Sequence, residues 1–351
     1  MTPEPIDLRS DTITRPTPEM LAAMAQASHG DDSRDGDPTV QQLEALAAQR
    51  CGKAAALFLP SGTMANLVAI LAHTARAGEV LIEATSHTLT SELGGLGAVA
   101  GQFYRPLPGH RGAIDIDALR AAIRPPGIRR HQVGTALIQV ETTHNQAGGA
   151  VLPLAHMAAV WDLAQRLNVP VHVDGARLFN AAAALGVDVD VIAQYADSVN
   201  FCISKGLSAP IGSLLCGSHA FIEAARGYRR MVGGNLRQAG PLAAAGIVAI
   251  ERMAARLADD HATAQQLARG LAQINPTLVD PATIETNIVR VDVSRSPLDA
   301  EQWERKLAAH GIRVGAYGAE RQLRLVTHRH IDAAAIETVL AAVRQMLQSR
   351  H

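Results

Sequence analysis

The sequence predicts an α/β protein in which a mostly parallel β-sheet forms a large domain, followed by a smaller α+β domain. Two observations support this prediction. Up to Gly240, short apolar segments alternate with longer segments of helical periodicity, which is typical of strands buried on both faces of a parallel sheet. After Gly240 the pattern changes to long alanine-rich helices and two further short strands.

Composition narrows the class of protein. A chain of 351 residues with 48% hydrophobic residues is long enough for two domains with sizeable cores. The net charge of −1 argues against a nucleic-acid partner. No apolar run approaches the roughly 18 residues that span a bilayer, and the first residues lack a signal-peptide pattern. The cysteines Cys51, Cys202 and Cys216 have neither disulfide nor metal-ligand spacing, so we expect a cytoplasmic protein.

The elements of the large domain follow from local patterns. Residues 1–16 are polar and contain several prolines, and we expect an extended arm that ends at a helix capped by Thr17. After a loop at 30–38, a second helix is expected to be capped by Thr39. A helix is also expected at 154–167. The expected strands are 54–59, 80–82, 136–141, 169–173 and 199–203, with 212–216 as a sixth, antiparallel strand.

The rest of the chain is expected to form the small domain. Helical periodicity predicts two long helices at 242–257 and 264–274. The further expected elements are strands 288–293 and 323–326 and helices 300–310 and 333–346. We therefore divide the chain into a large domain of residues 1–250 and a small domain of residues 251–351, with the boundary inside a helix near Met253.

Small polar residues follow the first predicted strand. The order strand, Ser61-Gly62-Thr63, helix directs backbone N–H groups and the positive end of a helix toward the space above the sheet. A phosphate group is the ligand that suits this turn. The alternative is that Ser61 only caps the helix.

Lys205 follows the apolar strand 199–203 and is flanked by small residues. An amine at the carboxyl end of a strand lies where open α/β folds bind ligands, and apolar neighbours would favour a neutral amine that forms a Schiff base. The alternative is an ordinary surface lysine. Asp174 follows another strand in the same way, with a helix cap as its alternative role, and His87 follows a third.

These four groups are expected to meet at one edge of the sheet. A ligand that uses all of them needs a phosphate, an aromatic face for His87, a ring nitrogen for Asp174 and an aldehyde for Lys205. Pyridoxal 5′-phosphate has each of these features. The sequence therefore predicts this cofactor.

Two arginines are candidates for binding a substrate carboxylate. Arg177 lies three residues after Asp174, and Arg324 lies in a predicted strand of the small domain. Each alone could equally be a solvated surface arginine. His144 is expected to be a loop residue without contact to the cofactor, and no pair of histidines has the spacing of a zinc site, so no metal is expected.

Several motifs occur in collinear order from about Ile6 to His328. They are Asp-Leu-Arg-Ser-Asp-Thr, Pro-Ser-Gly-Thr-Met, His87, Glu141 with Thr-His-Asn, His-Val-Asp-Gly-Ala-Arg, Ser-Lys-Gly-Leu-Ser-Ala-Pro-Ile-Gly-Ser, Leu-Arg-Gln-Ala-Gly and Arg-Leu-Val-Thr-His. Together they resemble the low-specificity L-threonine aldolases, which belong to the aspartate-aminotransferase fold group, fold type I, of pyridoxal-phosphate enzymes. The resemblance implies this fold and this cofactor.

The resemblance also implies roles for individual residues. Lys205 would carry the cofactor, Asp174 would contact its ring nitrogen, and His87 would stack on its ring. The expected cofactor site as a whole is Ser61, Gly62, Thr63, His87, Asp174, Arg177, Lys205 and Arg237, and Arg237 is expected to come from a neighbouring subunit. The expected substrate-carboxylate site is Ser10, Arg177 and Arg324. Members of the family are usually homotetramers, built from dimers that share active sites.

Some positions depart from the family pattern. Arg34 stands where members usually have a tyrosine, and residues 88–91 stand where they often have aromatic residues. Both positions border the β-substituent of the substrate, so Arg34 raises the expectation of an anionic substituent, as in 3-hydroxyaspartate. A second active-site histidine of the family corresponds to His131.

The expected reaction is retro-aldol cleavage of a β-hydroxy-α-amino acid, of the L-threonine or L-allo-threonine type, to glycine and an aldehyde. His87, or a water that it shares with His131, is the expected base. The alternatives are an aldolase that prefers phenylserine or 3-hydroxyaspartate, an aminotransferase, a β-eliminating lyase and a non-enzymatic regulator on the same fold. Small-molecule substrates are the expected partners.

Overall fold

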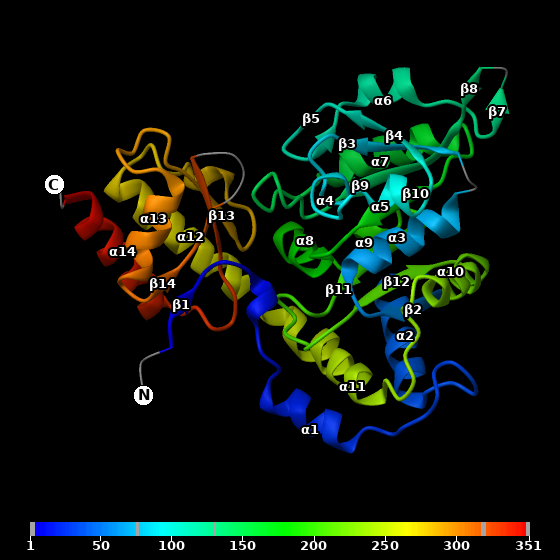
Figure 1. The fold of residues 1–351 in the computed structure, drawn as a ribbon, viewed down its shortest axis with the longest axis horizontal. Coiled ribbons are helices and arrows are strands. Elements are labelled where there is room, and N and C mark those ends of the chain that lie inside the picture. The colour runs from blue at the N-terminus through cyan, green and yellow to red at the C-terminus, as the bar shows by residue number, and fades with distance from the viewer. Residues whose placement is uncertain (1–3, 75–76, 130, 317–320, 349–351) are drawn as a thin grey trace.

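The computed structural model of the chain (Figure 1) describes residues 4–74, 77–129, 131–316 and 321–348. Its helices are α1 (Pro18–Gln26), α2 (Pro38–Arg50), α3 (Gly62–His73), α4 (His87–Thr90), α5 (Gly95–Ala98), α6 (Ile116–Ala122), α7 (Leu154–Gln165), α8 (Leu178–Leu185), α9 (Val189–Ala193), α10 (His219–Met231), α11 (Gly240–Val248), α12 (Leu257–Ile274), α13 (Ala300–Ala308) and α14 (Ala333–Gln348). Its strands are β1 (Ile6–Asp7), β2 (Ala55–Leu59), β3 (Glu79–Glu83), β4 (Phe103–Leu107), β5 (Gly109–His110), β6 (Ala113–Ile114), β7 (Ile128–Arg129), β8 (Gln132–Val133), β9 (Thr135–Glu141), β10 (Val171–Asp174), β11 (Ser198–Cys202), β12 (Ser213–Gly217), β13 (Ile288–Asp292), β14 (Ile312–Arg313), β15 (Gly315–Ala316) and β16 (Gln322–Val326). Among these described helices, none is long and apolar enough to cross a membrane.

A seven-stranded sheet in the order β2-β12-β11-β10-β9-β3-β4 forms the centre of the large domain. β12 runs antiparallel to both of its neighbours, and the other strands share one direction. The six strands predicted for this domain are all present, including the antiparallel one. The edge strand β4 was not predicted, because its sequence is mixed in polarity and contains Pro106, which edge strands tolerate.

Helices cover both faces of this sheet. α3 and α10 pack on one face, around Leu57, Leu59 and Leu215. α2, α7, α8 and α11 pack on the other face, where Phe58 and Phe201 are buried. Strands covered in this way are almost entirely buried, which explains their continuous apolar sequences. Each polar side chain in these strands therefore needs a partner inside the protein.

The small domain has its own sheet and core. β13, β16 and β15 form a three-stranded antiparallel sheet, and Trp303 and Leu325 belong to a second cluster of buried side chains. The core of the large domain extends to Leu257, and α12 enters the second core at Ala264. A π-helical turn, Ala249–Met253, and a 3-10 turn precede α12, so the division predicted at residues 250 and 251 falls within an irregular stretch of helix.

The N-terminal arm is more ordered than its polar sequence predicts. β1 pairs in parallel with β14, and Leu8 and Asp11 are completely buried. The arm then crosses to the large domain (Figure 1), where Thr14 donates a hydrogen bond from Oγ1 to the backbone oxygen of Lys205 at 2.7 Å. An arm that is anchored to both domains can place polar groups beside the loop that carries this lysine.

Helix caps agree with the sequence in one case and not in another. Thr17 accepts a hydrogen bond from Met20 and caps α1, as predicted. The cap of α2 is Asp37 and not Thr39, because Pro38 occupies the first helical position and the Asp37 carboxylate accepts from the N–H groups of Thr39 and Val40 at 3.0 and 3.2 Å.

Candidate active site

The predicted polar groups gather at the edge where the parallel strands end. Ser61 follows β2, His87 follows β3, Asp174 ends β10 and Lys205 follows β11. His87, Glu92 and Asp174 each place one polar side-chain atom within 4.8 Å of the other two. These oxygens and this ring nitrogen are joined by hydrogen bonds to one another or to Asn66.

The turn between β2 and α3 is open to solvent at its rim. Ser61 caps α3 by accepting a hydrogen bond from the N–H of Met64 at 3.2 Å, and its neighbour Thr63 is exposed. The N–H groups of Gly62 and Thr63 have no acceptor within the helix, because they lie in its first turn. A Cβ atom on Gly62 would lie 2.7 Å from Cys202 Sγ, so glycine is needed for α3 to approach β11 this closely. The turn therefore combines the predicted cap with N–H groups directed at the site.

Asp174 is buried, with 2% of its surface exposed. Its Oδ2 accepts a hydrogen bond from Asn66 Nδ2 at 2.8 Å, and its Oδ1 accepts one from the backbone N–H of Ala176 at 3.1 Å. α8 begins only at Leu178, so Asp174 is not the cap of that helix. Asn66, on the second turn of α3, was not predicted as a site residue; an amide on a helix gives no local signal of its role.

His87 is paired with a glutamate that the sequence analysis also missed. Its Nδ1 lies 3.0 Å from Glu92 Oε1, and Asn66 donates a second hydrogen bond to the same oxygen at 2.8 Å. The hydrogen bond to Glu92 raises the pKa of His87, since it outweighs burial and adds to the charges of Asp174 and Glu141. Burial raises the pKa of Glu92. The pair therefore holds a proton close to the site.

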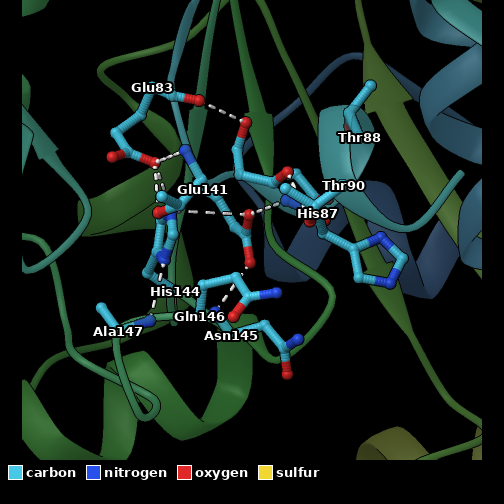
Figure 2. A network of polar contacts seen from close by, with 12 residues as sticks. Glu83, His87, Thr88, Thr90, Glu141, His144, Asn145, Gln146 and Ala147 are labelled. Carbon is cyan, nitrogen blue, oxygen red and sulfur yellow. Dashed lines mark hydrogen bonds and ion pairs between the residues drawn. The ribbon is translucent and has the colours of Figure 1, made fainter. Parts of the chain in front are cut away.

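Figure 2 shows a second network, centred on His144, beside the first. His144 is completely buried, with Nε2 3.1 Å from Glu83 Oε2 and 3.8 Å from Glu141 Oε2. Burial disfavours its charge, but the hydrogen bond to Glu83 and the charge of Glu141 outweigh burial and raise the pKa of His144. Glu141 in turn accepts hydrogen bonds from the backbone N–H groups of His87 and Asn145 at 2.6 and 2.7 Å.

This network makes His144 more than a loop residue. It belongs to the loop after β9, as predicted, and it contacts Glu83 and Glu141, through which it orders the start of α4. The imidazole of His87 points away from this cluster (Figure 2). The network thus fixes the backbone of His87 and leaves its ring directed elsewhere.

Lys205 stands apart from the other lysines. The chain has three, Lys53, Lys205 and Lys306. Lys53 donates to the backbone oxygen of Ala196 at 2.6 Å, and Lys306 is exposed on α13. Lys205 is half-buried in the turn after β11, and within the described parts of the chain its Nζ forms no hydrogen bond or ion pair. An amine without a partner at a buried strand edge is available for covalent chemistry.

Arg177 contacts a residue that was not predicted as part of the site. Its Nε and Nη2 donate to the two carboxylate oxygens of Asp11, both at 2.7 Å, and both side chains are buried. Burial alone would raise the pKa of Asp11, but Arg177, Lys205 and Arg324 hold it well below its usual range. These charges place Arg324 near the same carboxylate.

Ser10 lies next to this ion pair. It caps the 3-10 turn Asp11–Ile13 and accepts hydrogen bonds from the backbone N–H and the hydroxyl of Thr12 at 3.2 and 2.9 Å. The structure thus brings Ser10, Arg177 and Arg324 into one region. Asp11 already occupies the Nε and Nη2 edge of Arg177 that bidentate binding would use.

Three predicted residues are not brought to this edge within one chain. His131 is exposed in the turn between β7 and β8, which precedes β9, and so lies at the opposite end of that strand from Glu141. Arg34 is 79% exposed and 3.8 Å from Asp31. Arg237 also lies 3.8 Å from Asp31, and it donates to Ser33. The sequence around His131, Arg34 and Arg237 contains no pattern that would distinguish a surface loop from a loop of the site.

The residues at the edge fit pyridoxal 5′-phosphate. The N–H groups of Gly62 and Thr63, in the first turn of α3, suit a phosphate. Asp174 is a buried carboxylate of the kind that a protonated ring nitrogen needs. Lys205 supplies an amine at the end of the neighbouring strand, and His87 supplies a ring beside Asp174. The donor set matches each functional group of this cofactor.

Comparisons with known proteins agree with the fold and with the predicted cofactor. Residues 7–294 match the β-eliminating lyase family. The low-specificity L-threonine aldolase 1 of Arabidopsis thaliana is 40% identical over 345 residues, which cover 97% of this chain and 96% of the relative. The low specificity L-threonine aldolase of Escherichia coli K12 is 39% identical over 343 residues, which cover 97% of this chain and 99% of the relative.

A solved structure, the threonine aldolase of Leishmania major, superimposes with a TM-score of 0.82 at 17% identity and covers 98% of this chain and 100% of that one. Fold and site together define the class as the pyridoxal-phosphate enzymes of fold type I. Within this class, the chain belongs to the low-specificity L-threonine aldolase family.

Proposed function

We propose that the protein is a pyridoxal-phosphate-dependent aldolase that cleaves L-threonine, L-allo-threonine and related β-hydroxy-α-amino acids to glycine and an aldehyde. The observation that carries this proposal is that Lys205 and the buried Asp174 stand at the same ends of two neighbouring strands, β11 and β10, at the edge that also carries Gly62 and His87. The full-length similarity to L-threonine aldolases supports it.

When bound, the cofactor supplies an aldehyde and an electron-withdrawing ring. Lys205 would bind the aldehyde carbon, Asp174 would contact the ring nitrogen, and the N–H groups of Gly62 and Thr63 would hold the phosphate. Ser10, Arg324 and the Nη1 group of Arg177, which the pair with Asp11 does not use, would orient the substrate carboxylate. In the reaction the Cα–Cβ bond breaks, the β-hydroxyl loses its proton to become an aldehyde carbonyl, and Cα takes up a proton to give glycine.

His87 is the base that this geometry favours. Its Nδ1 is engaged by Glu92, which leaves Nε2 to take the β-hydroxyl proton. Glu92 then stabilises the imidazolium that forms. His131 takes no part in this proposal within a single chain, because it lies at the opposite end of β9.

Substituting Glu92 with glutamine tests this assignment. A base must be neutral to act, so the acid limb of kcat/KM follows the pKa of His87, and activity rises as pH increases through it. Because Glu92 raises that pKa, we expect Glu92→Gln to move the acid limb to lower pH by about half a unit to one unit. Glu285→Gln, which removes a carboxylate paired with Arg111, serves as the control. An acid limb that stays in place or moves to higher pH in Glu92→Gln would contradict the assignment.

Product analysis decides the reaction class. Incubation with L-threonine, L-allo-threonine, phenylserine and 3-hydroxyaspartate should release glycine and the corresponding aldehyde. A β-eliminating lyase would release ammonia and a 2-oxo acid, and an aminotransferase would form a new amino acid only when a 2-oxo acid is added. Because Arg34 pairs with Asp31 on the surface, we expect no particular gain for the diacid. Formation of ammonia without glycine would exclude the aldolase.

The site is open to solvent on the side of the Ser61 turn, where Ser61 and Thr63 are exposed, and this supports an assembly in which a neighbouring subunit covers that side. The cavity beside Lys205 within one chain is only about 10 Å³, smaller than the space of one water. Next to this rim, Leu93 is fully exposed, and Val99, Phe103 and Tyr104 are more than half exposed. An apolar surface of this kind marks an interface. The proposed assembly is a homotetramer of dimers with shared active sites, in which Arg237 faces a neighbouring subunit.

Substitution of Leu93 tests the assembly. A charge in a buried interface is costly, so Leu93→Asp should reduce the molar mass measured by light scattering below that of a tetramer and lower kcat/KM by about tenfold or more. Leu21→Asp, on α1, introduces the same charge at another exposed leucine and should change neither quantity. An unchanged mass in Leu93→Asp would place the interface elsewhere.

A cytoplasmic location is also part of this proposal. The three cysteines are buried and free, which supports it.

A further inference from the structure

A continuous chain of buried polar groups runs beneath Asp174, on the face of the sheet that α3 covers. Asn66 Oδ1 lies 3.4 Å from His172 Nε2, His172 Nδ1 lies 2.8 Å from Ser198 Oγ, and Ser198 Oγ lies 2.6 Å from His73 Nε2. His172 and Ser198 are completely buried. None of these groups contacts the reacting atoms, yet the chain ends on the carboxylate that faces the cofactor.

The sequence positions of these residues explain why they meet. His172 and Asp174 are two residues apart on β10, so their side chains point to the same face. Ser198 is the register partner of His172 on β11. Asn66 and His73 are seven residues apart on α3, two turns along the same side of the helix. The face of α3 that carries Asn66 and His73 therefore covers the row of polar side chains on β10 and β11.

The amide of Asn66 sets the direction of the hydrogen bonds between these side chains. Asn66 Nδ2 faces the oxygens of Glu92 and Asp174 at 2.8 Å each and donates to both. Its Oδ1 is thereby left as the acceptor for His172, and the matching tautomer of His172 has a proton on Nε2 and a lone pair on Nδ1. Ser198 therefore donates to His172 and accepts from His73 Nε2. Every donor along the chain points toward Asp174.

The two imidazoles are neutral. Burial lowers the pKa of His172 to about 4 and that of His73 to about 3. A neutral imidazole has a proton on only one of its two nitrogens, so its hydrogen-bond neighbours determine which nitrogen carries that proton. These hydrogen-bonded side chains therefore direct aligned dipoles at Asp174 and add no net charge.

Asp174 needs such donors because its surroundings are crowded with charge. Glu92 and Glu141 face it with like charge, from the loop after α4 and from the end of β9, while His87 and His144 face it from α4 and from the loop after β9. Aligned hydrogen bonds strengthen one another, so the donors that end on Asp174 hold its carboxylate in one position among these groups.

We propose that Asn66, His172, Ser198 and His73 form a one-directional relay that positions the carboxylate of Asp174 for its contact with the ring nitrogen of the cofactor. This inference rests on the proposed function. The four residues are positioning residues, since they act through Asp174. Asn66 also links Asp174 to Glu92, and through Glu92 to His87, so one amide orders two groups of the proposed cofactor site.

The first test is the tautomer of His172 in the cofactor-free protein. Nitrogen-15 NMR of histidine-labelled protein should show His172 protonated on Nε2 alone between pH 6 and pH 9, as the relay requires. In Ser198→Ala, the lone pair on Nδ1 loses its donor, and we expect a mixture of tautomers. A proton on Nδ1, or an imidazolium, in the unsubstituted protein would overturn the relay.

The second test is the dissociation constant of pyridoxal 5′-phosphate. Loss of one hydrogen bond in the relay is expected to raise this constant by about three- to tenfold in Ser198→Ala. Ser213→Ala is the matched control, because Ser213 is an equally buried hydroxyl on the next strand that donates only to the backbone oxygen of Phe201. Ser198→Thr keeps the hydroxyl and should restore both the tautomer and the affinity.

The outcomes separate the relay from the proposed function. If Ser198→Ala and Ser213→Ala change cofactor binding equally, the relay is wrong and the aldolase assignment stands. If the unsubstituted protein does not bind pyridoxal 5′-phosphate, the proposed function fails, and the proposed action of the relay on the cofactor fails with it. A single Nε2 tautomer that is lost in Ser198→Ala and kept in Ser213→Ala, together with the difference in affinity, supports the relay.

Discussion

Replacement of Lys205 with alanine is expected to abolish aldol cleavage and to remove the visible absorption band of the bound cofactor. No other lysine can replace it, because Lys53 is bonded to the backbone of Ala196 and Lys306 lies in the small domain. We expect kcat to fall by at least about 10²- to 10⁴-fold. Lys53→Ala is the matched control and should keep both the band and the activity.

The three lysines also make a direct mapping experiment possible. Reduction of the cofactor-loaded protein with borohydride fixes the cofactor to the nitrogen that carries it, and peptide mass spectrometry then locates it. The added mass should be found only on the peptide with Lys205. Its appearance on Lys53 or Lys306, or a visible band that persists in Lys205→Ala, would contradict the proposed role.

Replacement of Asp11 with alanine is expected to have the largest effect on stability. Asp11 and Arg177 form a buried, bidentate pair, and without Asp11 the guanidinium would stay buried without its counter-charge. Breaking a buried pair by removing one partner costs about 3–5 kcal/mol of unfolding free energy. Urea unfolding of Asp11→Ala against the unsubstituted protein measures this loss.

The control for Asp11 lies on the same arm. Asp7 pairs with Arg9, which is about half exposed, so Asp7→Ala should change the unfolding free energy by at most about 1 kcal/mol. Equal effects of the two substitutions would show that the buried Asp11–Arg177 pair contributes no more to the free energy of unfolding than the exposed Asp7–Arg9 pair. Asp11→Ala combined with Arg177→Met removes both charges and should recover part of the loss.

The stability provided by Asp11 should also depend on pH with a defined sign. Its pKa is depressed in the folded protein, so its contribution is fully present above the unfolded value near pH 4 and is lost as pH falls toward the folded value. The difference between the unsubstituted protein and Asp11→Ala should therefore narrow below about pH 4. A difference that is constant from pH 7 to pH 3 would argue against an ionised Asp11.

Much of the fold was predictable because it depends on local pattern. Strands buried on both faces need continuous apolar runs, and each such run in the large domain is a strand in the structure, including the antiparallel β12. The polar residue that follows a strand is local as well, so Asp174 and Lys205 could be placed at the same edge before the sheet order was known.

The sequence by itself determined the class of the fold, the positions of Lys205, Asp174, His87 and the Ser61 turn at strand ends, and the family that these motifs share. Only the tertiary structure decided which side chains are their partners. Asp11 meets Arg177 across 166 residues, Asn66 meets Asp174 across 108, and His144 meets Glu83 across 61. Such pairs depend on strand register, helix rotation and the path of the arm, which no short stretch of sequence encodes. The same dependence explains why His131, Arg34 and Arg237 lie outside the edge in a single chain, where no local pattern separates an exposed loop from a site.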